Sequence, residues 1–188
     1  MGFGKSLGYS LILFVALNFV FALLASAIGG TINTFFDGFT SDPLSILIVL
    51  FMPILMFPGL SHLLLLGSFL GGGELQIALL LTLIGYIASP LIAALVGGNM
   101  AETKAQAFGA WLVTMFISAG ALIAAYFIGQ ELSTAFGALG DLGMLISLIT
   151  GTSEMGDILM IGFLVLNAYL NGAFYGCFAQ LTSGMDYY

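Results

Sequence analysis

The chain has 188 residues, of which 61% are hydrophobic and 6% are charged, and its formal net charge is −7. Soluble globular domains carry about 25% charged residues, so this composition excludes that class. The chain has two Lys or Arg residues, which excludes a nucleic-acid partner because phosphate binding requires a basic surface. We therefore expect a protein whose main partner is the lipid bilayer.

Long, continuous apolar runs predict an all-α fold, a polytopic transmembrane helical bundle of five or six spans. A membrane β-barrel would instead show alternating apolar segments of about ten residues. Because the connections are short, we expect a single integral membrane domain over residues 1–188, in a multi-pass protein of the cell membrane. The expected spans are residues 7–28, 44–70, 75–96, 105–128 and 158–181, with 132–152 as a further candidate.

The first expected span, residues 7–28, carries small and polar residues at intervals of four, which places them on one helix face. These residues are Asn18, Ala22, Ser26 and Gly30. Helices in lipid associate through close backbone approach and occasional side-chain hydrogen bonds. We therefore interpret this face as a packing surface in which Asn18 bonds to a neighbouring helix.

Residues 29–42 are expected to form a loop, and the longest apolar run, residues 44–70, follows it. Pro53 and Pro58 each remove a backbone donor and disfavour helix at the preceding residue, which predicts a helix break in this run. Inside a membrane, the freed carbonyl groups need protein, water or an ion. The break is therefore one part of a candidate polar site. Its His62 is either a group that titrates near neutral pH or a neutral imidazole bonded to another helix.

Two courses of the run 44–70 are open. If it crosses the membrane once with a kink, Lys5 and Lys104 lie on opposite sides. If it is a re-entrant hairpin with Pro58 and Gly59 at its tip, both lysines lie on one side, as the positive-inside rule favours. We expect the kinked crossing, because it keeps the helix continuous.

The expected span 75–96 has Thr82, Tyr86 and Ser89 on one face, next to Pro90. This face favours hydrogen bonding between helices, and the alternative is that it forms part of a polar cavity.

The expected span 105–128 carries Trp111 in its first two turns, and we expect this ring at the membrane interface, where Trp is enriched. Its small residues predict a packing helix. They are Ala110, Thr114, Ser118, Ala121 and Ala125.

Residues 132–152 have two interpretations: a further span with Asp141 inside the membrane, or a partly inserted amphipathic helix with Asp141 at the surface. In the first, Asp141 is a candidate for proton or cation handling, because an acid in hydrocarbon is costly.

The last expected span, 158–181, has Asn167, Asn171 and Tyr175 at intervals of four. Amides without partners in lipid cost free energy, so they must face a helix, a cavity or another subunit. The complete candidate intramembrane polar site is His62, Asp141, Asn167, Asn171 and Tyr175.

One His and one Cys cannot build a common metal or redox centre, so we expect no metal and no cofactor. Adjacent residues Ser61 and His62 do not face each other on a helix, which disfavours a catalytic pair and an enzyme. The first functional hypothesis is a structural or anchoring subunit of a larger membrane complex, partnered by other subunits or by copies of itself. The alternative is a small transporter, channel or substrate-binding membrane component with a polar site at mid-membrane.

Overall fold

A computed structural model describes residues 2–41, 43–55, 77–128 and 157–184, and every regular element in these ranges is helical. The predicted all-α class is confirmed for this part of the chain. The elements are α1 (Gly2–Ile28), α2 (Ile32–Ser41), α3 (Ser45–Phe51), the 3-10 helix η1 (Met52–Leu55), α5 (Ile77–Asn99), α6 (Lys104–Ile128) and α9 (Asp157–Thr182).

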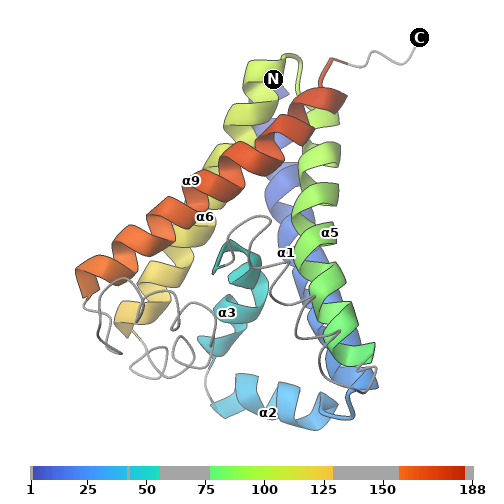
Figure 1. The fold of residues 1–188 in the computed structure, drawn as a ribbon, viewed down its shortest axis with the longest axis vertical. Coiled ribbons are helices and arrows are strands. Elements are labelled where there is room, and N and C mark those ends of the chain that lie inside the picture. Colours follow the sequence, from blue (N-terminus) through green and yellow to red (C-terminus); the bar gives the residue numbers. More distant parts are fainter. Residues whose placement is uncertain (1, 42, 56–76, 129–156, 185–188) are drawn as a thin grey trace.

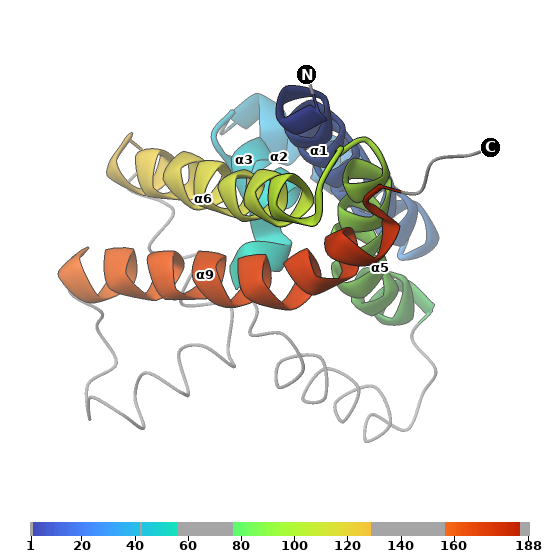
Figure 2. The same ribbon diagram turned by 90° about the horizontal axis from the view of Figure 1, so that it is seen from above.

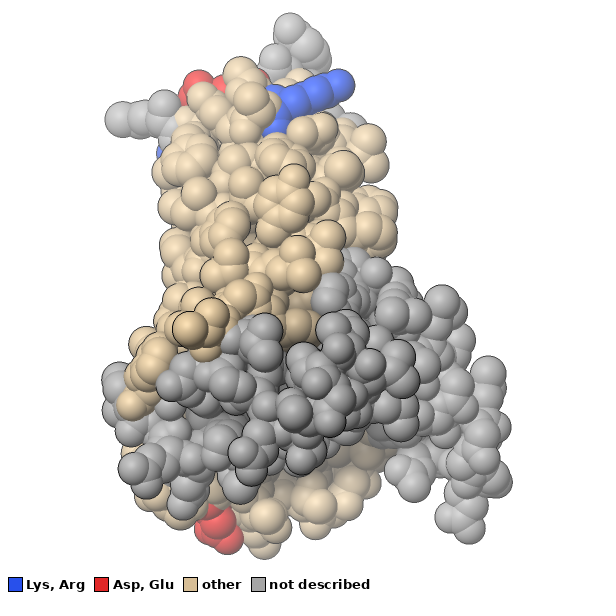
Figure 3. Space-filling model, turned by 60° about the vertical axis from the view of Figure 1, so that its left-hand side comes forward, with Lys and Arg blue, Asp and Glu red and all other residues tan. Residues whose placement is uncertain are grey.

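In the described part of the chain, four helices are long and apolar enough to cross a membrane. A helix of about 20 residues spans about 30 Å, the thickness of the hydrocarbon core. Their apolar segments match four of the expected spans, so the chain is a membrane-embedded helical protein. The segments are Gly2–Ile28, Leu80–Asn99, Lys104–Ala125 and Ile161–Thr182. On the face drawn in Figure 3, the described charged side chains lie towards the two ends, and the described surface between them is uncharged.

The helices α1 and α5 lie side by side along their lengths and run in opposite directions (Figure 1). A Cβ atom on Gly85 would lie only 2.6 Å from Cβ of Phe21, and one on Gly97 would overlap Ser10. Pairing of residue 21 with 85 and of residue 10 with 97 defines an antiparallel register. Glycine permits this close backbone approach. Close packing of this kind holds helices together in lipid, where hydrophobic burial does not drive their association.

The helices α6 and α9 form a second antiparallel pair. A Cβ atom on Gly176 would lie 2.7 Å from Cδ2 of Phe108, and Gly172 lies against Leu112. The two pairs meet near the ends of the chain and diverge towards the opposite end, with α3 and η1 between them (Figures 1 and 2).

The antiparallel arrangement determines at which end of the bundle the chain leaves one helix of a pair and enters the other. Because α1 and α5 are antiparallel, the chain leaves α1 and enters α5 at the same end of the bundle (Figure 1). As a consequence, Lys5 and Lys104 lie at one end of the bundle, where Gly2 of α1 adjoins Glu102 of the loop before α6. Residues 56–70 lie outside the described residues, so whether the run 44–70 crosses once or is re-entrant stays a prediction.

The same reasoning applies to α6 and α9, which end and begin at one end of the bundle (Figure 1). Residues 132–152 themselves, with Asp141, lie outside the described residues.

One local expectation is wrong. The segment expected to be a loop contains α2, which lies across the end of the bundle away from the N-terminus (Figure 1). Its aromatic residues pack against each other, with 4.6 Å between the ring centroids of Phe35 and Phe39. Trp111 is completely buried within the protein, and its expected depth at the membrane interface stays a prediction. Inside the bundle, its indole Nε1 donates a hydrogen bond to the backbone carbonyl of Asn171 at 3.3 Å, which satisfies the polar end of the ring.

Candidate functional site

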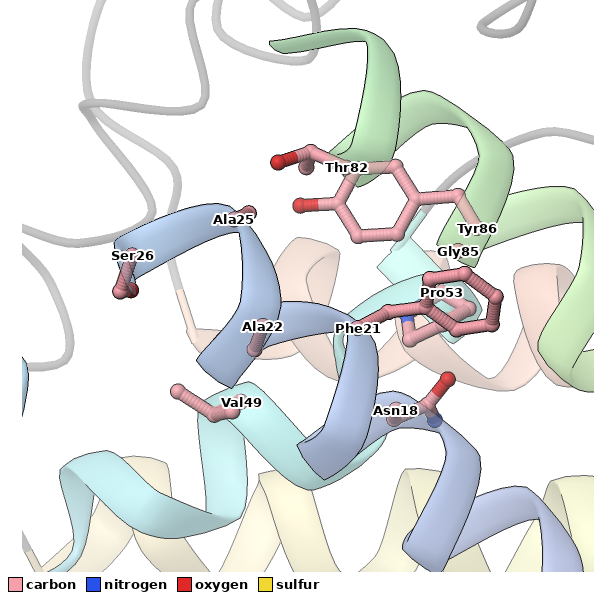
Figure 4. A pocket seen from close by; sticks show the side chains of 10 residues that line it. All are labelled: Asn18, Phe21, Ala22, Ala25, Ser26, Val49, Pro53, Thr82, Gly85 and Tyr86. Carbon is pink, nitrogen blue, oxygen red and sulfur yellow. The ribbon is translucent and has the colours of Figure 1, made fainter. Parts of the chain in front are cut away.

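A pocket of about 160 Å³ lies between α1, the α3–η1 segment and α5 (Figure 4). It lies beside two of the membrane-crossing helices and not in a surface loop. The described residues that line it are Asn18, Phe21, Ala22, Ala25, Ser26, Val49, Pro53, Thr82, Gly85 and Tyr86.

Helical periodicity explains which residues reach the pocket. Positions four apart on a helix share a face, so Asn18, Ala22 and Ser26 of α1 present one wall. Thr82 and Tyr86 of α5 present the facing wall by the same rule. The face of α1 that the sequence indicated as a packing surface, and the polar face of α5, therefore meet at a common cavity.

The short helix η1 closes the pocket with a proline. The α-helix α3 ends at Phe51, and Pro53 lies buried in the 3-10 helix that follows. In a 3-10 turn the N–H of residue 53 would bond to the carbonyl of Leu50, but proline has no N–H. The side chain of Asn18 supplies a donor, since its Nδ2 lies 2.6 Å from that carbonyl oxygen. The sequence feature that ends the helix thus also orients Asn18.

This bond uses the nitrogen of the Asn18 side-chain amide but not its oxygen. Its side-chain oxygen, Oδ1, is buried and accepts no hydrogen bond from any described residue. The whole residue is 5% exposed. In Figure 4 this oxygen points towards the pocket, on the side of Phe21 and Pro53. A strong acceptor therefore faces the cavity without a donor from the described parts of the chain.

The remaining polar groups of the wall are uncharged. The hydroxyl of Thr82 donates to the backbone carbonyl of Ala78 at 2.9 Å, so its lone pairs are what it can offer to the cavity. The hydroxyl of Tyr86 lies beside Thr82 in Figure 4. No Asp, Glu, Lys, Arg or His occurs among the described lining residues.

The polar stripe predicted on the last span lies elsewhere. Asn167, Asn171 and Tyr175 are 0%, 3% and 2% exposed on α9. The Nδ2 of Asn171 donates to the carbonyl of Asn167 at 2.9 Å, and Tyr175 packs edge-on to Trp111 of α6 at 6.2 Å. The two amides are therefore buried within the bundle, Tyr175 packs against α6, and none of the three lines the pocket.

The other predicted site residues are placed as follows. Pro53 lines the pocket, whereas Pro58, His62 and Asp141 lie outside the described residues. Within the described ranges, no three His, Cys, Asp or Glu side chains come together as a metal site would require.

Comparison with protein-family models, with curated proteins and with solved structures finds no match to this chain.

Proposed function

We propose that the protein is a membrane-embedded solute-binding component of the transporter or channel class, which holds a small uncharged molecule between α1, η1 and α5. The observation that carries this proposal is the buried oxygen of Asn18, which faces a cavity and lacks a donor among the described residues. An unsatisfied buried acceptor costs about 1–3 kcal/mol. Such a cost is expected at a site whose partner is a ligand.

The described start of the run 44–70 supports this proposal, because α3 ends at Phe51 and the 3-10 helix η1 follows it. We infer that the run 44–70 is re-entrant, because the described helices α1 and α5 end and begin at the same end of the bundle. Discontinuous helices of this kind form substrate sites near the middle of the membrane in many transporters. Ser26 and Thr82 lie near the ends of α1 and α5 on the side of α2, so we expect the solute to enter from that side.

A purely structural subunit would be favoured if the amide stripe of α9 faced away from the chain. Asn167 and Asn171 are instead buried within the chain. Assembly of this chain with other membrane subunits or with itself is compatible with solute binding and stays a prediction, as does its location in the cell membrane.

Pocket filling tests the proposal. Purified protein is heated in detergent with increasing concentrations of phenol or toluene, because a ligand that binds the folded state raises its unfolding temperature. We expect stabilisation of the wild type and of Ala16→Phe, whose position is exposed on α1, but not of Ala22→Phe, which places a ring in the pocket. Equal stabilisation of both variants, or none in the wild type by either probe, would contradict the proposal.

A further inference from the structure

We infer that the pocket selects uncharged molecules that carry an O–H or N–H donor on an apolar body of about the size of benzene. This inference rests on the proposed function and adds the chemical class of the solute.

The orientation of Asn18 determines that this side chain accepts a hydrogen bond from the solute and does not donate one. An amide can be turned end for end, which exchanges its oxygen and nitrogen. The carbonyl of Leu50, 2.6 Å from Nδ2, is an acceptor only, so the nitrogen must stay on that side. The oxygen is thereby fixed towards the cavity, and only a donor on the solute can satisfy it.

The hydroxyl of Thr82 provides a second hydrogen-bond acceptor in the pocket wall. Since the Thr82 hydroxyl hydrogen is directed at the carbonyl of Ala78, its oxygen presents lone pairs to the pocket. Two of the polar atoms around the cavity thus favour donors, and a solute without one would leave the Asn18 oxygen buried and unpaired.

The size of the pocket limits the rest of the solute. Pockets for drug-sized ligands measure about 300–1,000 Å³. The volume of about 160 Å³ is smaller, and it is close to that of an engineered apolar cavity of about 150 Å³ that binds benzene. Apolar groups of Phe21, Val49 and Pro53 supply surface for such a body.

The charge of the solute follows from the walls. A full charge among membrane-spanning helices requires a counter-charge or a coordinating shell. The described walls contain neither a cationic nor an anionic side chain. The donor on the solute is therefore a neutral hydroxyl or an uncharged N–H, such as that of an amide or an aromatic amine.

Phenol and toluene form a matched pair of probes, because they share ring and size and differ in the hydroxyl donor. The measured quantity is the ratio of their dissociation constants, toluene over phenol, in the wild type and in Asn18→Leu. Both probes partition into detergent, but this partition is common to the two proteins and cancels when their ratios are compared. We expect the ratio to fall about tenfold in Asn18→Leu, the loss of about 1.4 kcal/mol of discrimination.

Two further variants keep the test decisive. Ser10→Ala is the control: Ser10 is also buried in α1, its hydroxyl also lacks a described partner, and it does not line the pocket, so the ratio should not change. If Asn18→Leu does not fold, Thr82→Val replaces it, because the Thr82 hydroxyl bonds only within its own helix among the described contacts. Thr82→Val should lower the ratio by a smaller factor.

The outcomes separate this inference from the proposed function. If both probes bind, if Ala22→Phe blocks them and if the ratio is the same in all unblocked proteins, selection of donors is refuted while solute binding stands. If neither probe binds the wild type, the pocket is not a solute site and both proposals fail.

Discussion

Replacement of Trp111 by alanine tests the packing of the bundle most strongly, because this ring joins three helices. Its ring centroid lies 5.8 Å from that of Phe14 on α1 and 6.2 Å from that of Tyr175 on α9, both edge-on. Each such aromatic pair contributes about 1 kcal/mol. The hydrogen bond from Nε1 to the carbonyl of Asn171 adds about 0.6 kcal/mol, the average for side-chain hydrogen bonds measured in a membrane protein.

A cavity would add to this loss. A residual void of roughly 50–100 Å³ costs about 1–2 kcal/mol at about 24 cal/mol per Å³. The sum predicts that Trp111→Ala lowers the free energy of unfolding by about 4 kcal/mol. Trp111→Phe keeps an aromatic ring but loses the hydrogen bond, and should cost about 1–2 kcal/mol.

The assay is unfolding by SDS in mixed micelles, followed by far-UV circular dichroism because the variant removes the single Trp of the chain. The control is Phe116→Ala on the same helix, where the side chain is 40% exposed. Lipid or detergent fills the space that Phe116 leaves, so its loss should cost less than about 1 kcal/mol. If Trp111→Ala cost no more than Phe116→Ala, the central position of this ring would be refuted.

Three more predictions follow from the helix contacts. A Cβ atom on Gly98 would lie 2.8 Å from the backbone carbonyl carbon of Ala179, so Gly98→Ala should lower the free energy of unfolding by about 2 kcal/mol. The control is Gly120→Ala, which should not lower it because nothing lies within 4 Å of a Cβ atom there. Equal effects of the two variants in the same SDS titration would contradict this contact. Asn171→Leu should weaken the packing of α6 on α9 by about 1 kcal/mol. It should not change the oligomeric state in mild detergent, since the side chain is buried within the chain. Loss of a partner chain on size-exclusion chromatography would show that Asn171 instead contacts another chain. The buried indole of Trp111 should fluoresce at short wavelength and resist quenching by iodide, and emission typical of water-exposed indole would count against its burial.

Hydropathy was sufficient to predict the four membrane-crossing helices, because each contains an apolar run of spanning length. It was not sufficient for α2. That segment contains Asp37, Gly38 and Thr40, which are typical of turns, but its phenylalanines pack together on a short helix. Local propensity was here overridden by contacts between aromatic side chains.

The direction of the chain could not be predicted from the sequence. A proline-broken apolar run has the same composition whether it crosses the membrane or turns back. With two lysines in the chain, the positive-inside rule gave little information on orientation. The contacts of Gly85 with Phe21 and of Gly97 with Ser10 show that α1 and α5 are antiparallel. Such contacts depend on which helices pack together.

The pocket was visible in the sequence only as separate parts. The polar faces of α1 and α5 and the break at Pro53 were each predicted from spacing or residue type. Their meeting at one cavity depends on the register of two helices and on the bond from Asn18 to Leu50, which periodicity within one helix does not determine. The α9 stripe had the stronger sequence signal, yet its amides and phenol are used for packing.

The most direct test of the arrangement is the accessibility of single cysteines in a Cys177→Ser background, where the serine hydroxyl can keep the bond that Cys177 Sγ makes to the carbonyl of Ala173. Lys5→Cys, Lys104→Cys and Asp37→Cys are each treated in sealed, uniformly oriented vesicles with a reagent that does not cross membranes. The antiparallel pairs predict that positions 5 and 104 react from the same side and that position 37, on α2, reacts from the other. Labelling of positions 5 and 104 from opposite sides would contradict the account, because the segment between α1 and α5 would then cross the membrane once.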